Sequence, residues 1–169
     1  MNPSHPETPQ RTTDDGPLQI SGKALVAICS ELKRLLADVF AMYIKTKSFH
    51  WQMTGSHFRD YHLLLDEQAG QLFAMTDPIA ERSRKLAGNA LRSIGEIALH
   101  QRVRDSEQEG LPPEAMLSEL LADNRMLAHN LRTAHVICDQ FGDVATAGLI
   151  ENWIDEADRR TWFLRQIKS

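Results

Sequence analysis

Long apolar runs are missing from this sequence. No segment approaches the roughly 18 uncharged apolar residues that a membrane-spanning helix needs. The first ten residues, MNPSHPETPQ, also lack the apolar stretch of a secretory signal. We therefore expect a soluble, cytoplasmic protein with no membrane partner.

Cysteine is scarce as well. Cys29 and Cys138 are the only two among 169 residues, and each falls inside an apolar stripe with helical spacing. We interpret them as small core residues and not as a disulfide or a metal clip.

The chain also has no excess of positive charge. It contains 19 Lys and Arg against 23 Asp and Glu, a formal charge of -4, which gives no overall electrostatic reason to expect nucleic acid as a partner. The first 22 residues carry Arg11 as their one Lys or Arg, against Glu7, Asp14 and Asp15. DNA binding would have to be local, and the candidates near the C-terminus are Arg159, Arg160, Arg165 and Lys168.

The remaining composition predicts one all-α domain. A chain of 169 residues with 42% hydrophobic content can bury one core and is too short for two ordinary domains. Residues 1–20 contain four prolines and are predicted to be a flexible tail, which leaves residues 21–169 for the domain. Strands are not expected, because no segment alternates apolar and polar residues between turn signals.

Apolar residues recur at helical spacing in four long segments. A short helix over Ile94 to Gln101 is predicted inside the long connection between the second and third segments. Short first and last turns with one long crossover predict a ferritin-like four-helix bundle. The expected boundaries are Ser21 as the first N-cap, Gly55 and Gly88 as the ends of the first two helices, Pro113 and Gly142 as the limits of the third, and Asp143 as the cap of the fourth.

The candidate chemistry lies on one face of the second predicted helix. His62, Asp66, Asp77 and Glu81 fall within an arc of roughly 100° that faces away from the chain's own apolar seam, and His50 lies just upstream. Each residue alone is weak evidence, since surface imidazoles and carboxylates are usually only solvated. His62 and Glu81 are about 28 Å apart along the helix, so one chain cannot complete a metal site with both. Antiparallel packing of two copies would bring His62 and Asp66 level with the other copy's Asp77 and Glu81.

This ligand set predicts a redox iron site between subunits. Two imidazoles with up to three carboxylates suit Fe(II) and leave positions open for an oxidant, although zinc could occupy the same site. Ferritins with a di-iron centre inside one bundle use a Glu-x-x-His motif, and this chain contains none. Four further histidines, at positions 57, 100, 129 and 135, have no partner at metal spacing and are interpreted as surface or core residues.

The segments KSFHWQMTGSHFRDYHLLLDEQ and TDPIAERSRKLAG resemble the signature of the Dps mini-ferritins. FGDVATAGLIENWIDEADRRTWFLR is similar to that family's fourth helix, so the resemblance covers about residues 21–168. It implies a hollow dodecameric shell built from two-fold dimers, with hydrogen peroxide as the preferred oxidant and oxygen as the other. It also implies a ferroxidase centre in which one subunit's His50, His62 and Asp66 face its neighbour's Asp77 and Glu81.

Some positions depart from the family pattern. Ala157 and Asp158 stand where many relatives have His-Glu, and Gly148 stands where many carry an aspartate that lines a subunit pore. Asp139 and Asp143 are candidates for an acidic funnel, although a role as helix N-cap is a sufficient explanation for Asp143.

Two interpretations stay open at the site itself. Pro78 should bend the second helix or restart it with Asp77 as N-cap, which would make Asp77 a bridging or weaker ligand. Trp51, next to His50, is either a redox-active neighbour or a large interface aromatic.

We therefore expect iron storage and detoxification by an intersubunit ferroxidase that protects against oxidative stress. The alternative is a nucleoid-associated DNA-protection protein in which iron oxidation is secondary, and the composition of the tail argues against it. A third hypothesis is a plain structural bundle whose His and Asp residues only pair across a dimer.

Overall fold

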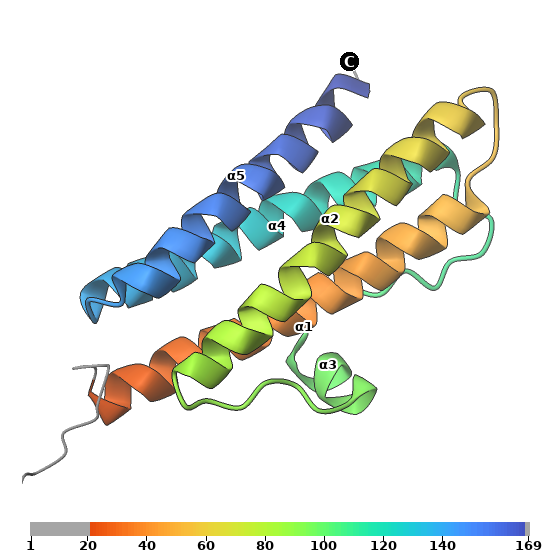
Figure 1. Ribbon diagram of the computed structural model, residues 1–169. Coiled ribbons are helices and arrows are strands. Elements are labelled where there is room, and N and C mark those ends of the chain that lie inside the picture. The colour runs from red at the N-terminus through yellow and green to blue at the C-terminus, as the bar shows by residue number, and fades with distance from the viewer. Residues whose placement is uncertain (1–20, 168–169) are drawn as a thin grey trace, which may run out of the picture.

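The chain folds as a helical bundle. The computed structural model describes residues 21–167, so the predicted tail over residues 1–20 lies outside it. In this range there are five helices and no strand, which confirms the predicted fold class (Figure 1). The helices are α1 (Gly22–Gln52), α2 (Phe58–Lys85), α3 (Ile94–His100), α4 (Pro113–Gln140) and α5 (Val144–Ile167).

Side chains at the helix starts satisfy the free backbone donors there, as the sequence predicts. Ser21 accepts a hydrogen bond from the backbone N–H of Ala24 at 3.3 Å. Asp143 accepts one from the N–H of Thr146 at 3.0 Å. Pro113 occupies the first turn of α4, where its missing N–H has no cost.

The helix ends confirm one predicted glycine and correct two others. Gly142 has a φ of 71° directly after α4, as predicted. At the end of α2 the left-handed residue is Ala87, with a φ of 60°, and Gly88 follows it and donates its N–H to the carbonyl of Ser83 at 2.9 Å. A side chain at Gly88 would place its Cβ 2.5 Å from Sγ of Cys29, so close packing of α2 on α1 requires the glycine. Gly55, with a φ of 100°, lies within the α1–α2 turn and not at the end of α1.

The four long helices form two antiparallel pairs, α1 with α2 and α4 with α5, and α1 also contacts α4 (Figure 1). Their facing stripes build one main core, in which Leu35, Val39, Leu72, Leu131 and Ile150 are fully buried. The crossover after α2 carries α3 along the side of α1. A ferritin-like bundle needs this one long connection, and the short helix predicted within it is confirmed.

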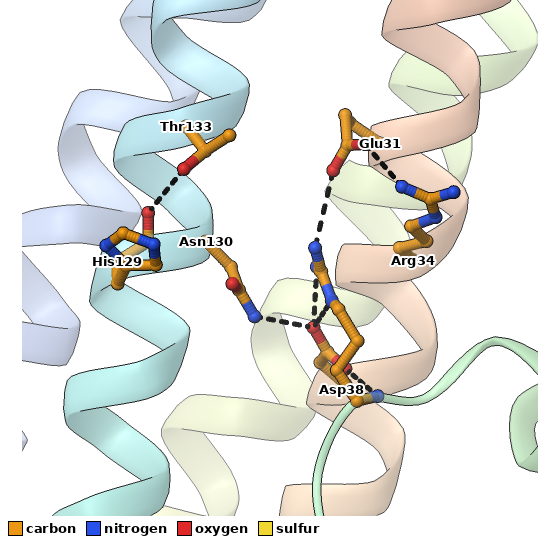
Figure 2. Close-up of polar contacts among 7 residues, drawn as sticks. Glu31, Arg34, Asp38, His129, Asn130 and Thr133 are labelled. Atoms are coloured by element: carbon orange, nitrogen blue, oxygen red, sulfur yellow. Dashed lines mark hydrogen bonds and ion pairs between the residues drawn. The ribbon is translucent and has the colours of Figure 1, made fainter.

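A buried carboxylate fixes the crossover against α1. Asp38 is inaccessible to solvent and accepts the backbone N–H of Arg102 at 2.6 Å and its Nε–H at 2.9 Å. Asn130 of α4 donates to the same carboxylate at 3.3 Å, and Glu31 contacts the guanidinium at 3.4 Å (Figure 2). A buried charge is stable only when paired and hydrogen-bonded, so these contacts tie the crossover to both α1 and α4.

Pro78 does not interrupt α2. The helix runs continuously from Phe58 to Lys85, so the alternative in which it restarts with Asp77 as N-cap is wrong. Proline still removes one backbone donor, but the helix continues through it, and Met75 and Ile79 on either side are buried in the main core. Asp77 is therefore exposed on an unbroken helix and has no capping task.

Candidate metal centre

His50 and His62 hold each other in place across the α1–α2 turn. Nδ1 of His50 lies 2.7 Å from the carbonyl oxygen of His62, and Nδ1 of His62 lies 2.9 Å from the carbonyl oxygen of His50. A carbonyl only accepts, so each Nδ1 carries the hydrogen, and each Nε2 keeps the lone pair that a metal ion needs. The rings stack with centroids 3.7 Å apart. This arrangement fixes both tautomers and both ring planes before a metal arrives.

The short α1–α2 turn explains why the two rings meet. Phe49 and Met53 are buried on either side of His50 and pack into a second apolar cluster with Leu65. This cluster anchors the end of α1 against the start of α2. The ring centroid of Phe58 lies 4.9 Å from that of His62, with the planes inclined by 34°.

Asp66 follows His62 by one helical turn, and it is held by Lys47 of α1. The Lys47 Nζ lies 2.7 Å from Oδ1 of Asp66. The hydrogen bond and the charge of Lys47 lower the pKa of the Asp66 carboxyl, and the two histidines add a smaller effect in the same direction. The carboxylate is therefore ionised, as a metal ligand must be.

Asp77 and Glu81 lie far from these residues in the same chain. Both are exposed and one turn apart, and Glu81 pairs with Lys85 at 3.1 Å. Along α2, Glu81 is about 28 Å from His62. In residues 21–167 no group of three His, Cys, Asp or Glu side chains could hold a metal ion. The single chain thus brings His50 and His62 into contact, holds Asp66 one turn further along α2 on Lys47, and leaves Asp77 and Glu81 apart.

The two groups of candidate ligands are symmetric about one point on α2. The midpoint between His62 and Glu81 falls between residues 71 and 72, and the midpoint between Asp66 and Asp77 falls at the same place. A single two-fold axis through this point would bring both pairs level between two antiparallel copies of α2. All four residues also lie within one arc of roughly 100° on the helix.

Comparisons with known proteins bear on the family and the fold of this chain. A ferritin-like domain matches residues 29–168. The DNA protection during starvation protein 1 of Deinococcus radiodurans is 28% identical over 145 residues, which cover 86% of this chain and 70% of that protein. A low temperature-induced protein of Nostoc sp. is 35% identical over 138 residues, covering 79% of this chain and 75% of that protein. The X-ray structure of Dps from Thermosynechococcus elongatus matches with a TM-score of 0.85 at 29% identity, over 87% of this chain and 93% of that one.

This chain belongs to the Dps family of ferritin-like proteins. The resemblance inferred from the sequence motifs is thereby confirmed, together with the four-helix bundle that it implies.

Lys47 contacts the candidate ligand Asp66, a pairing that the sequence did not reveal. It precedes His50 by one helical turn on α1, so its side chain reaches the same face. That spacing was visible in the motif KSFHW, but the contact with Asp66 depends on the pairing of α1 with α2.

The acidic-funnel candidates differ in exposure. Asp143 is only 3% exposed, and its carboxylate binds Thr146 and, at 2.7 Å, Arg82. These contacts support the role of Asp143 as a helix cap. Its carboxylate does not face the solvent. Asp139 is exposed, and it lies 3.1 Å from Nδ1 of His135. His135 also contacts Glu151 of α5 at 3.0 Å, a partner that sequence spacing did not reveal.

The basic candidates for DNA contact need one correction. Arg160 is 1% exposed, and its Nε donates to Asn124 inside the bundle at 2.8 Å. Burial lowers the pKa of this guanidinium to about 10, but it has no access to a phosphate. Arg159 pairs with Glu67 at 3.7 Å, and Lys168 lies outside the described residues.

Both cysteines are core thiols, as predicted. Neither forms a disulfide, and Cys138 is buried. Burial raises the pKa of Cys29 and raises that of Cys138 to about 12, so both thiols are protonated. None of the helices within residues 21–167 has the length and apolar character that crossing a bilayer requires.

Proposed function

We propose that two copies of this Dps chain pair antiparallel along α2 and form two ferroxidase centres. In each centre His50, His62 and Asp66 of one copy and Asp77 and Glu81 of the other bind Fe(II). The observation that carries the proposal is the shared midpoint of the two ligand groups on α2. The preset Nε2 lone pairs support it, because a pair of neutral imidazoles beside carboxylates suits Fe(II).

The oxidation step is balanced when two ferrous ions share one oxidant. Each Fe(II) loses one electron, hydrogen peroxide accepts both, its O–O bond breaks, and two protons complete two water molecules. With oxygen as oxidant, the same two electrons and two protons give hydrogen peroxide. The protein's task is to hold two ferrous ions together, so that two-electron reduction outruns one-electron release of hydroxyl radical.

We propose that the product is stored as a ferric mineral inside a hollow homo-dodecamer built from these two-fold dimers. The exposed apolar side chains on α1, α2 and α3 support assembly, since such surfaces are normally covered by a partner. They include Ile44, Phe73, Ile94 and Leu99. Zinc is a second occupant that the same ligands would accept.

Trp51 is 66% exposed in the single chain and lies next to His50 on α1. Its position fits both proposed roles, a redox-active neighbour of the iron or an aromatic that a second copy covers. Trp51→Phe separates them. It keeps the apolar contact and removes the readily oxidised indole, so a redox role predicts unchanged assembly with altered radical yield.

DNA binding is the second candidate, because the Deinococcus relative is named for DNA protection. The described residues do not favour it: Arg160 is buried, and Arg159 pairs with Glu67. We propose a cytoplasmic location. Association with the nucleoid would need basic side chains other than Arg159 and Arg160. A gel shift that persists at ~150 mM salt would support the DNA alternative.

The function is tested by peroxide-driven oxidation of Fe(II) in wild type and in His50→Ala/His62→Ala. The proposal predicts a large loss of rate with the assembly intact by size-exclusion chromatography. An unchanged rate in the variant would contradict the proposal. A monomeric protein that still oxidises Fe(II) would contradict it as well.

A further inference from the structure

No contact within the single chain explains why position 70 is a glycine. It lies in the interior of α2, where glycine is the least favourable residue after proline. It is exposed, and a Cβ added there would meet nothing within 4 Å. Gly88 offers the contrast, since its missing side chain makes room for Cys29. The space beside Gly70 is open in one chain and is therefore available to another.

Phe73 is the large residue on the same face, one turn further along α2. Its side chain is 54% exposed. The ring is held from one side by Tyr43 of α1, with centroids 5.2 Å apart and planes inclined by 44°. The other side of the ring faces solvent and has an apolar surface to bury.

Gly70 and Phe73 are symmetric about the same point as the candidate ligands. Their midpoint also falls between residues 71 and 72. At 100° per residue both lie inside the arc that contains His62, Asp66 and Glu81. A two-fold axis that pairs His62 with Glu81 therefore places the Phe73 of each copy opposite the Gly70 of the other.

We propose that the ring of Phe73 packs over Gly70 of a second copy and thereby sets the register of the two α2 helices. This inference rests on the proposed function, because it uses the same two-fold axis. A second copy is the occupant that fits, since the ligand groups on either side of the axis are complementary. One group has two imidazoles and Asp66, whose charge Lys47 balances, and the other has the carboxylates of Asp77 and Glu81.

Register matters because the metal ligands lie away from the axis. Asp66 and Asp77 are about 8 Å from the midpoint along α2, and His62 and Glu81 are about 14 Å from it. Sliding by one turn would move each ligand about 5.4 Å from its partner and break both centres together. A large side chain seated on a glycine at the axis resists that slip, and it also allows a close approach of the helices.

The direct test is Gly70→Ala, with Gly70→Leu as a stronger version. In the isolated chain the added Cβ meets nothing within 4 Å, and both alanine and leucine are better helix formers than glycine, so the bundle should fold at least as well. We expect Gly70→Ala to weaken Zn²⁺ binding about tenfold, as displaced supporting contacts typically do. Gly70→Leu should abolish it. The measurement is calorimetric titration of the full-length, metal-free protein, with circular dichroism to check helix content.

Gly148→Ala is the matched control, because Gly148 also lies inside a helix and its Cβ would meet nothing within 4 Å. It should bind Zn²⁺ as wild type does. Wild-type Zn²⁺ affinity and assembly in Gly70→Leu would overturn the inference and leave the proposed function standing. Wild-type Zn²⁺ affinity in His62→Ala would instead overturn the proposed function.

A swap provides an independent test, because positions 70 and 73 exchange places across the axis. Gly70→Phe alone sets two rings against each other, and Phe73→Gly alone leaves two small residues facing. Both single variants should bind Zn²⁺ weakly. The double variant restores a ring opposite a glycine and should recover part of the affinity. A double variant no better than the weaker single variant would show that the two positions do not meet.

Discussion

His50 and His62 each present Nδ1 to the other's backbone carbonyl oxygen, at 2.7 and 2.9 Å. The contact joins the last turn of α1 to the first turns of α2 and leaves both Nε2 atoms free for a metal. A single chain therefore already holds the two imidazoles of the proposed centre in a fixed orientation. The carboxylates of the second copy would complete it.

Replacing His62 with Phe should remove metal binding while preserving the ring stack with His50. The change deletes one Nε2 ligand and one Nδ1 donor. We expect Zn²⁺ affinity to fall more than ~100-fold, since even supporting residues of a metal site typically cost 10- to 100-fold. His57→Phe is the control, because that exposed ring lies just before α2 and outside the ligand group. Equal losses in both variants would contradict the assignment of His62.

Removing the charge of Lys47 should raise the pKa of Asp66. The ammonium holds that pKa below its ordinary value of 3.8, so Lys47→Met should return it toward 3.8. The sign follows from linkage: a depressed folded-state pKa stabilises the protein above the unfolded pKa, and this is lost as the pH falls through the depressed value. Carboxyl ¹³C NMR titration measures the shift. An unchanged Asp66 pKa would show that the ion pair does not persist in solution.

Adding a methyl group at Gly88 should destabilise the bundle. Its Cβ would lie 2.5 Å from Sγ of Cys29 and 2.9 Å from Oγ of Ser83. Overpacking of this kind costs about 1–3 kcal/mol, so Gly88→Ala should lower the thermal midpoint. Cys29→Ala removes the closest of these contacts and should recover part of the loss in the double variant. Additive losses would mean that the two residues do not touch.

Truncating Arg102 should loosen the crossover, because it leaves Asp38 buried with little compensation. Breaking one side of a buried pair costs about 3–5 kcal/mol, and we expect Arg102→Ala to approach that range. Hydrogen exchange should speed up across residues 94–105. Arg92→Ala is the control, since its pair with Glu96 is exposed and surface pairs contribute little. Similar effects of both variants would argue against the anchoring role of Asp38.

Much of this fold follows from local rules in the sequence. The caps at Ser21 and Asp143 and the seven-residue apolar repeat from Phe58 to Leu86 depend on neighbours within a few positions, so they are predictable. The repeat is buried from Leu65 onward, whereas Phe58 is exposed. The end of α2 is not, because the choice between Ala87 and Gly88 depends on how closely α2 approaches Cys29 of α1.

The candidate site is likewise predictable from the sequence only where it depends on spacing along one helix. The spacing of the ligands on α2 indicates that one chain cannot close the centre, and the single chain agrees. The ion pair of Lys47 with Asp66 and the contact of His135 with Glu151 join different helices, and spacing along one helix cannot reveal them. Arg160 was a candidate for DNA contact, although its position between Ala157 and Leu164 on the buried stripe of α5 indicates the core.

The central claim is that each metal centre draws its ligands from two chains, and mixing two inactive variants tests it most directly. One variant is His50→Ala/His62→Ala and the other is Asp77→Ala/Glu81→Ala, assembled together and assayed for peroxide-driven Fe(II) oxidation. Each variant alone should be inactive. In a mixed dimer one centre receives both intact halves and the other receives neither, so random mixing should restore about one quarter of the wild-type centres. Mixed assemblies with no more activity than the separate variants would contradict an intersubunit centre.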